Sequence, residues 1–351
     1  MQAQPAPHSP PSASQPALES SLLPADPVRQ DISKHDLTKH ELVKHDLIKH
    51  DLIKHDLIKH EHIAAVESRM LSLLAVDHVG AALYHMKTGG QRVRARLGLH
   101  ASLALGQSND DAITLAAAVE LLHNASLVHD DLQDRDVKRR GKPTVWAIYG
   151  DNIAICAGDL LLAAAYRALS AYSDCRKLPD LLMLAFDRTA VAIEGQCDDL
   201  SSLVNSHDLA DYEKIAVAKS GALLSLPIEF ALVASGRTDL TALARSAAEA
   251  FAIAYQIVDD LADIGPEPAK SLASDSFNII TVLQRDGLTG DVKSAAQRIG
   301  LHHARAAIAA ADALPDNMGA ILKVLALSLQ PSLTGTVEPV ATSVSFAARV
   351  P

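Results

Sequence analysis

Aromatic residues are scarce in this chain of 351 residues and make up only 3% of it. Glycine and proline rarely interrupt its long segments, and no stretch alternates convincingly between apolar and polar residues as a half-buried strand would. The long segments are instead rich in alanine and leucine, which favour helix. The sequence therefore predicts an all-α protein and argues against a fold built on a sheet.

Cysteine is also rare, and the three that occur are Cys156, Cys175 and Cys197, with no CxxC spacing among them. An odd number without that spacing predicts reduced, partly buried thiols, as in a cytoplasmic protein. The formal net charge of −10 argues against a nucleic-acid partner. The sequence has no apolar segment of the secretory type near its start and no run of about eighteen apolar residues, so we predict no membrane span.

Composition divides the chain into three parts. Residues 1–30 are rich in Pro, Ser, Ala and Gln, and a pentad repeat of the form KHDLI follows at 34–63. A period of five advances about 140° around a helix at each repeat, so its leucines form no single apolar stripe. We expect residues 1–63 to be a disordered extension, 64–330 to form one large domain, and 331–351 to be a loose tail. A His-rich metal-binding or assembly segment is the alternative interpretation of the repeat.

Helical periodicity predicts the elements of the central domain. The Thr-Gly-Gly stretch at 88–90 is expected to end the first helix. Residues 143–148 are expected to form a short extended connection. The helices that we expect span residues 64–86, 92–105, 110–132, 152–172, 178–203, 209–236, 240–262, 279–285, 292–313 and 318–329.

An acidic cluster ends one of these apolar helices. Asp130 and Asp134 stand four residues apart with Asp131 beside the first, so a helix projects the outer two from one face, about one turn apart. Carboxylates this close repel each other unless a cation lies between them, and Mg²⁺ is usually held by one or two carboxylates together with substrate phosphates. Arg139 and Arg140 follow, and their guanidinium groups suit phosphate oxygens. This stretch predicts a metal and diphosphate site.

A second acidic cluster repeats the spacing far along the chain. Asp259 and Asp263 are again four residues apart, with Asp260 between them, and they too close an apolar run. A single cluster of this kind could be a solvated helix end. Two clusters predict that a pair of acidic helices holds one Mg²⁺–diphosphate from both sides.

The order and spacing of motifs over residues 64–310 resemble those of the trans-isoprenyl diphosphate synthases, the family that includes farnesyl and geranylgeranyl diphosphate synthases. The motifs are GGQRVR at 89–94, LLHNASLVHDDLQD at 121–134, RRGKPT at 139–144, AGDLLLAAAY at 157–166, GQ at 195–196, KSGALL at 219–224 and YQIVDDLAD at 255–263. The resemblance implies a helical bundle of the isoprenoid synthase type around a central apolar cavity. It also implies a homodimer.

The resemblance further implies a role for each matching residue. Asp130, Asp134 and Asp259 would bind Mg²⁺, with Asp131, Asp260 and Asp263 as further ligands or as supports for the ligands. The catalytic set would be Asp130, Asp131, Asp134, Arg139, Lys219, Asp259 and Asp260. Arg139, Lys219, Ser220 and Gln256 would lie at the allylic diphosphate, and Gln91, Arg94, His123 and Arg140 at isopentenyl diphosphate.

Two positions depart from the family pattern. Gln91 stands where the family has lysine, so it offers hydrogen bonds without charge, and a charge-assisted bond to phosphate is about twice as strong. The loop after the second acidic cluster contains one lysine, Lys270, where the family usually has a loop with lysine and glycine that contacts diphosphate. These departures favour a specialised or less active member.

The implied activity is a Mg²⁺-dependent prenyl transfer that condenses isopentenyl diphosphate with an allylic diphosphate, head to tail. The small residues Ala125 and Ser126, five and four before Asp130, are predicted to let the product grow beyond C15. Leu121 or Leu122 would then limit its length and favour geranylgeranyl diphosphate, C20. A class I terpene cyclase and a non-catalytic partner subunit of a synthase are the alternative functions.

Overall fold

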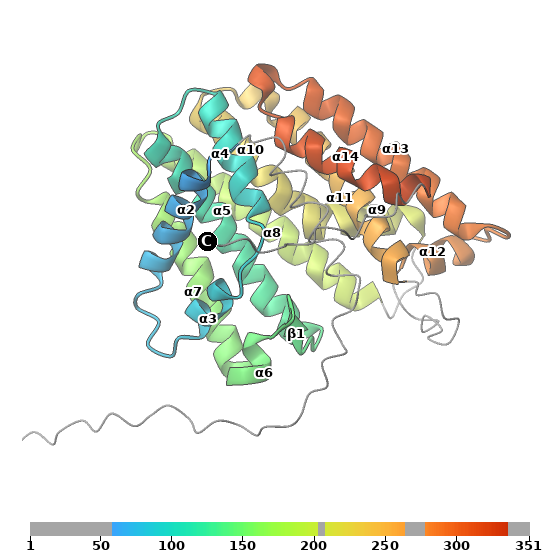
Figure 1. The fold of residues 1–351 in the computed structure, drawn as a ribbon, viewed down its shortest axis with the longest axis horizontal. Helices are drawn as coiled ribbons and strands as arrows, with labels where there is room; N and C mark the ends of the chain where they lie inside the picture. Colours follow the sequence, from blue (N-terminus) through green and yellow to red (C-terminus); the bar gives the residue numbers. More distant parts are fainter. Residues whose placement is uncertain (1–57, 203–207, 264–277, 336–351) are drawn as a thin grey trace, which may run out of the picture. The chain divides into compact units, whose positions relative to one another are not determined.

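The computed structural model describes residues 58–202, 208–263 and 278–335 (Figure 1). The predictions for residues 1–57, for the loop that contains Lys270 and for the tail from 336 onward fall outside these described residues. The first described helix begins at His60, so the end of the pentad repeat is already helical.

Helices account for nearly all of the described secondary structure, which confirms the all-α prediction. The helices are α2 (His60–Leu73), α3 (Ala81–Lys87), α4 (Val93–Ala104), α5 (Asn109–Gln133), α6 (Val145–Tyr149), α7 (Asp151–Leu169), α8 (Leu178–Ser202), α9 (Leu209–Ala216), the π-helix η1 (Val217–Gly221), α10 (Ala222–Ala234), the 3-10 helix η2 (Thr238–Leu240), α11 (Thr241–Asp263), α12 (Ile279–Arg285), α13 (Val292–Asp312), the 3-10 helix η3 (Pro315–Asn317) and α14 (Ala320–Thr334). The two short strands β1 (Lys138–Arg139) and β2 (Lys142–Pro143) pair antiparallel.

The single helix predicted over residues 64–86 is wrong, because α2 ends at Leu73 and α3 starts only at Ala81. The break has a local cause. Gly80 adopts φ 77°, a left-handed conformation that glycine tolerates better than other residues. The side chain of Asp77 accepts hydrogen bonds from the backbone N–H groups of Gly80 at 2.9 Å and Leu83 at 3.0 Å, which satisfies donors at the start of α3.

The extended connection predicted over residues 143–148 is also wrong, because α6 begins at Val145. Arg140 and Gly141 both have positive φ, as a two-residue hairpin loop of type I′ requires. After the hairpin, Thr144 Oγ1 and Trp146 Nε1 both donate to the carbonyl oxygen of Asp136, at 2.7 and 2.8 Å. These bonds turn the chain into a helix at the point where the sequence indicated extension.

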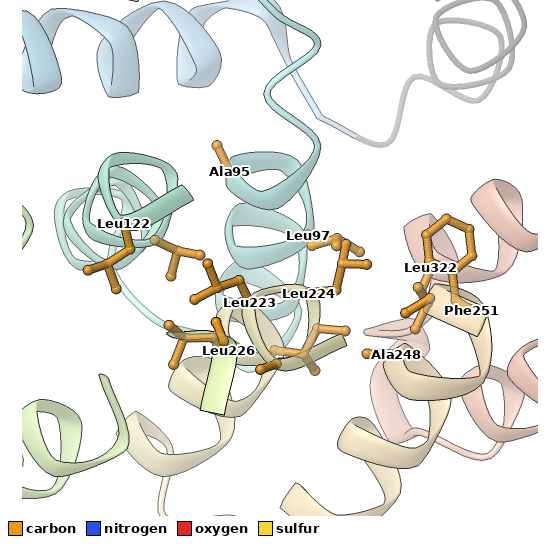
Figure 2. Packing of buried hydrophobic residues seen from close by; sticks show 14 of the residues in the cluster. Ala95, Leu97, Leu122, Leu223, Leu224, Leu226, Ala248, Phe251 and Leu322 are labelled. Atoms are coloured by element: carbon orange, nitrogen blue, oxygen red, sulfur yellow. The ribbon is translucent and has the colours of Figure 1, made fainter. Parts of the chain in front are cut away.

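The core is centred on α5 and α10. Twelve of the thirteen residues of α10 are buried, and the helix packs against α4, α5, α8 and α11. Figure 2 shows Leu122 of α5 and Leu223 and Leu226 of α10 gathered between these helices, with Phe251 of α11 nearer to Leu322 of α14. Helix α5 therefore carries its acidic end out of the most deeply buried part of the described bundle.

Three helical segments of the described chain are long and apolar enough to cross a membrane, judged by length and composition alone: Asn109–Gln133, Asp151–Leu169 and Leu209–Ala234. The sequence criterion of uninterrupted apolar residues did not find them, because polar residues interrupt each one. In the fold, 72% of the most apolar part of Asn109–Gln133 is buried, 44% of that of Asp151–Leu169 and 78% of that of Leu209–Ala234. Most of the apolar part of α5 and of the α9–α10 segment is therefore buried in the core.

The cysteines differ from the prediction, because Cys156, Cys175 and Cys197 are all exposed rather than partly buried. All three are free thiols. Cys156 follows Ile155, and both side chains are exposed on α7. The apolar residues around Cys156 in the sequence therefore did not indicate that it is buried.

A charged cluster lies inside the bundle away from the acidic helix ends. Glu229 of α10 is fully buried, and its carboxylate oxygens lie 3.1 Å from Arg188 Nε of α8 and 2.9 Å from Arg245 Nη2 of α11. The cluster joins three helices through one acid. An unpaired buried charge is much more costly than a lost surface pair.

We therefore predict that Glu229→Ala lowers the free energy of unfolding by about 3 to 5 kcal/mol, because it removes the buried carboxylate that pairs with Arg188 and Arg245 and leaves them only the charge of Glu249. Asp312→Ala is the matched control. It removes a 2.8 Å pair with Lys323 whose side chains are 52% and 40% exposed, and it should cost at most about 1 kcal/mol. Denaturant unfolding of both variants measures the difference, and equal costs would show that Glu229 is not an essential partner.

Candidate active site

The first acidic cluster lies at the C-terminal end of α5, with Asp134 as the C-cap residue. The C-terminus of a helix carries partial negative charge, so carboxylates there need nearby cations. Asp130 has two: Lys219 Nζ lies 3.3 Å from its Oδ1, and Arg139 Nη2 lies 3.5 Å from its Oδ2. The structure thus brings together Asp130, Arg139 and Lys219, which the sequence predicted to share a site.

Asp131 turns inward from the same helix end and is 1% exposed. Its Oδ1 accepts a hydrogen bond from Arg139 Nε at 2.6 Å. Burial raises the pKa of Asp131 to about 6, against the opposing effect of the Arg139 charge. Among the described residues its second oxygen has no hydrogen-bond partner. Asp131 therefore fixes Arg139 of the β1–β2 hairpin beside Asp130.

Asp134 is exposed, whereas Asp130 is partly buried and Asp131 is buried. Partial burial raises its pKa, and the charges of Asp130, Asp199 and Asp136 raise it further, while Lys219 acts in the opposite direction. The carboxylates of this end of α5 are therefore close enough to repel one another. A cation that bound here would relieve that repulsion.

Lys219 lies in η1, where a π-helical turn joins α9 to α10 in place of the uninterrupted helix predicted over residues 209–236. Single π-turns are rare and occur often at functional sites. Burial alone would lower the pKa of Lys219, but the carboxylates of Asp130, Asp199 and Asp134 outweigh it and raise the pKa above its ordinary value. Lys219 therefore stays charged, and Ser220 follows it in the same turn and is partly buried.

Helix α8 supplies a residue that the sequence analysis did not single out. Asp199 Oδ2 lies 2.5 Å from Lys219 Nζ, so the lysine bridges Asp199 and Asp130. Gly195 lies one turn earlier, and a Cβ atom there would come within 2.4 Å of the backbone nitrogen of Lys219. Glycine thus lets α8 touch the π-turn. Gln196 Nε2 also donates to Gln133 Oε1 of α5 at 3.1 Å. The signal was available, since Asp199 stands three residues after the GQ pair.

The residues predicted to bind isopentenyl diphosphate form a cationic group. Burial lowers the pKa of His123 well below its ordinary value, and the charges of Arg94, Arg140 and Arg139 lower it further. Burial also lowers the pKa of Arg94 to about 10, and no described residue accepts a hydrogen bond from its Nε. Burial also lowers the pKa of Arg140, and the charges of Arg139 and Arg92 lower it further, which makes the surroundings of Arg140 a candidate anion site.

The GGQRVR turn forms one side of this cationic group. Arg140 Nη1 donates to the carbonyl oxygen of Gly89, and a Cβ atom at Gly90 would lie 2.8 Å from that guanidinium. The carbonyl oxygen of Gln91 accepts a hydrogen bond from Arg96 Nε at 3.1 Å. Arg140 is thus held against Gly89 and Gly90, and Gln91 follows them in the same turn.

A buried polar network supports the cationic group and was missed from the sequence. Arg92 is 5% exposed and lies 2.9 Å from Glu67. Glu120 is 3% exposed and accepts a hydrogen bond from the backbone N–H of Ala95 at 3.1 Å. His85 is buried against Asn124 at 3.0 Å, and burial lowers its pKa to about 3, so the imidazole is neutral. The acids offset part of the arginine charge, and the neutral histidine adds none.

The middle residue of the second acidic cluster is held by other residues of the protein. Asp260, which we had grouped with the catalytic residues, is 5% exposed and accepts hydrogen bonds from Tyr212, Ile279 and Gln256. Gln256, predicted at the diphosphate, donates to Asp260 in this structure. Asp260 is therefore a support inside the protein. Asp259 is partly buried beside it, and the side chain of Asp263 lies outside the described residues.

The donor set suits a hard divalent cation in chemical type. Asp130 and Asp134 offer carboxylate oxygens on one helix face, and burial raises the pKa of Asp134, with the charge of Asp130 raising it further. In the described part of the chain, no three His, Cys, Asp or Glu side chains are placed closely enough to enclose a metal ion. Substrate phosphate oxygens would have to complete the coordination, as they often do for Mg²⁺.

The two residues predicted to set product length differ in their surroundings. Ser126 is exposed, and it lies four residues, or about 40° around the helix, from Asp130. Ala125 is 4% exposed and belongs to the core, and five residues place it about 140° away from Asp130. Ser126 therefore lies near Asp130 on the helix surface and Ala125 does not, and the tunnel stays a prediction.

Comparison with known proteins agrees with this arrangement. Residues 78–275 match the model of the polyprenyl synthetase family, and the chain belongs to that family. A short chain isoprenyl diphosphate synthase of Methanocaldococcus jannaschii is 33% identical over 52% of this chain and 57% of the relative. A geranylfarnesyl diphosphate synthase of Aeropyrum pernix is 35% identical over 54% of this chain and 62% of the relative. The matched segments thus span less than two thirds of either relative.

The fold is shared with solved prenyl synthases. A geranylgeranyl pyrophosphate synthetase from Pyrococcus horikoshii superimposes with a TM-score of 0.69 at 25% sequence identity, covering 82% of this chain and 99% of that one. The match extends beyond the family segment to most of the described helices. It confirms the predicted isoprenoid synthase type of helical bundle.

Proposed function

We propose that this protein is a Mg²⁺-dependent trans-prenyltransferase that condenses isopentenyl diphosphate with an allylic diphosphate, head to tail. The observation that carries the proposal is the paired arrangement of charge. Lys219 pairs with Asp130 in an acidic group that includes Asp134. A neighbouring group contains the cations Arg94 and Arg140 around the neutral His123. Two sites of opposite character suit two diphosphate substrates, one bound through metal and one through arginine.

In the proposed reaction the bond between the allylic carbon and its diphosphate oxygen breaks, the double bond of isopentenyl diphosphate attacks that carbon, and a proton then leaves. Bound Mg²⁺, held by Asp130, Asp134 and Asp259, would neutralise charge on the departing diphosphate. Lys219 and Arg139 would donate hydrogen bonds to the same oxygens, and they are already held in place by Asp199 and Asp131.

The cationic group would bind isopentenyl diphosphate without metal. Arg94 and Arg140 supply charged donors, and His123 is neutral in the free protein because of its burial and its arginine neighbours. A bound diphosphate would favour protonated His123 by adding negative charge. Gln91 adds no charge here, so the arginines carry most of the affinity. The apolar core residues around α5 and α10 would exclude water from the reactive carbon.

Two alternative functions are a class I terpene cyclase and a non-catalytic partner subunit of a synthase. A class I terpene cyclase also uses an acidic Mg²⁺ cluster on a helical fold, but it needs no second diphosphate site and would leave the arginine group unexplained. A non-catalytic partner subunit is favoured by Gln91, which replaces the lysine of the family pattern. The intact acidic cluster with Lys219 and Asp199 argues against that alternative.

One assay separates these functions. Purified protein is incubated with Mg²⁺, isopentenyl diphosphate and an allylic diphosphate, and the products are resolved by chromatography. We expect a linear prenyl diphosphate. Asp130→Ala and Asp259→Ala should each lower turnover by more than about a hundredfold, because removing a metal ligand costs more than removing a support.

Asp312→Ala, on the distant surface pair, should leave turnover at the wild-type level. Circular dichroism checks that the inactive variants stay folded. A cyclic hydrocarbon product would instead indicate a cyclase, and substrate binding without any product would indicate the partner subunit. Wild-type turnover in either Asp variant would contradict the proposed site.

We propose geranylgeranyl diphosphate, C20, as the product, because only a small side chain, Ser126, lies exposed one turn before Asp130. Ser126→Phe should shorten the longest product by at least one isoprenyl unit, since an aromatic ring there would occupy the path of the growing chain. The products of wild type and variant are compared by chromatography. Unchanged product length would show that Ser126 is not on that path.

Ala125→Phe is the matched comparison for this experiment. Because Ala125 is buried in the core, the added ring should destabilise the fold by about 1 to 3 kcal/mol instead of acting on product length alone. Thermal unfolding detects this cost. A stable Ala125→Phe protein that makes a shorter product would instead show that Ala125 lines the path of the growing chain.

We also propose that the protein is a homodimer, associated through an outward stripe of α8. The spacing of the stripe alternates between three and four residues, which is the pattern of helices that pack against each other. Its most exposed large residues are Phe186 at 63%, Met183 at 61% and Ile193 at 57%. The full stripe is Met183, Phe186, Ala190, Ile193, Cys197 and Leu200.

Light scattering should therefore give the mass of two chains. Phe186→Glu should give one chain with unchanged helical content, because a charge cannot be buried between two apolar helices without a partner. Lys323 lies on α14, outside the stripe, and Lys323→Glu should leave the mass at two chains. A monomeric wild type would refute the dimer.

A further inference from the structure

A buried carboxylate in the second acidic cluster is fully engaged by the protein. Oδ2 of Asp260 accepts hydrogen bonds from Tyr212 Oη and from the backbone N–H of Ile279, both at 2.8 Å. Oδ1 accepts from Gln256 Nε2, also at 2.8 Å. The described donors to both oxygens are neutral, in a cluster whose other acids are expected to bind metal.

Three elements meet at this carboxylate. Tyr212 comes from α9, Asp260 and Gln256 from the last turns of α11, and Ile279 is the first residue of α12. The N-cap residue of α12, Asn278, adds a bond from its Nδ2 to the carbonyl oxygen of Asp260 at 3.3 Å. These bonds fix the rotation of the last turns of α11 relative to its neighbours.

Tyr212 is suited to this task by burial. Its side chain is 1% exposed and one of the largest fully buried side chains of the described chain. Burial raises the pKa of its hydroxyl far above the ordinary value, and the Asp260 charge raises it further, so the hydroxyl stays a donor. A neutral donor to a buried carboxylate stabilises the charge without competing for it as a cation would.

We propose that Tyr212 is a positioning residue for diphosphate binding: through Asp260 it sets the direction in which Gln256 and Asp259 face the Mg²⁺–diphosphate. This rests on the proposed function for the identity of the ligand, and on the hydrogen bonds alone for the geometry. Asp259 is next to Asp260 in sequence, so rotation of that turn moves its carboxylate as well.

Tyr212→Phe removes one hydroxyl and leaves the ring in place. The variant loses the hydrogen bond to the Asp260 carboxylate. This loss should weaken binding of Mg²⁺ with inorganic pyrophosphate about three- to tenfold. Excess Mg²⁺ should restore binding, because the ligands are misaligned and not removed. A purely structural loss would not be rescued in this way.

The matched control is Tyr166→Phe on α7, a partly buried tyrosine whose hydroxyl makes no hydrogen bond to the described residues. Pyrophosphate binding is measured by calorimetry over a range of Mg²⁺ concentrations. Amide hydrogen exchange in peptides covering 278–285 is measured on the same proteins. Exchange there should be faster in Tyr212→Phe, because the N–H of Ile279 bonds to the same oxygen, and unchanged in Tyr166→Phe.

The outcomes separate this proposal from the proposed function. If wild type does not bind Mg²⁺–pyrophosphate, the proposed function fails, and amide exchange still tests the Tyr212–Asp260 contact. If wild type binds and Tyr212→Phe binds equally well, the positioning role is overturned. Should Tyr212→Phe not fold, Asp260→Asn keeps one acceptor oxygen and is expected to show the same Mg²⁺-rescued weakening. Normal Mg²⁺ dependence in a folded Asp260→Asn protein would refute the role.

Discussion

Repulsion between carboxylates at the end of α5 is the constraint on which the rest of the site depends. A helix C-terminus is already negative, and Asp130 and Asp134 add charge to it. The protein compensates with cations from two other elements, Arg139 from the hairpin after α5 and Lys219 from the π-turn. Each compensating cation is shared with another acid, Asp131 or Asp199. Four carboxylates, those of Asp130, Asp131, Asp134 and Asp199, thus surround two cations, and an excess of negative charge remains that a divalent cation would reduce.

The site separates two kinds of acid that look alike in the sequence. Asp131 and Asp260 each stand second in an acidic cluster, and both are buried, at 1% and 5% exposure. Each is engaged by a side chain from elsewhere in the fold: Arg139 in the first case and Tyr212 in the second. In both clusters, therefore, the second carboxylate holds the site together from inside.

The class of fold and the position of the acidic helix end could be predicted from the sequence, because apolar periodicity and the spacing of Asp130 and Asp134 are local properties. Breaks that depend on side-chain capping were missed, as at Asp77, where a carboxylate and a glycine of positive φ interrupt an otherwise helical pattern. Partnerships between distant elements were missed for a different reason. Nothing local in the sequence of α9 indicates that Tyr212 meets Asp260. The GQ pair draws attention to the segment that contains Asp199, but it does not indicate that Asp199 meets Lys219.

The π-turn at Val217–Gly221 changes the direction in which the side chains of the following helix, α10, point. Its one additional residue per turn rotates all of α10 by about 100° relative to an uninterrupted continuation of α9. The directions of Lys219 and Glu229 thus depend on the same local insertion. Lys219 reaches the carboxylates of α5 and α8, and Glu229 lies between Arg188 and Arg245. Deleting one residue from this turn would let it close into an ordinary α-helical turn, and Glu229 would keep its direction, because losing the residue and losing the wide turn change the phase by about 100° in opposite senses. The same deletion placed in α10 before Glu229 has no such compensation and would turn Glu229 away from Arg188 and Arg245.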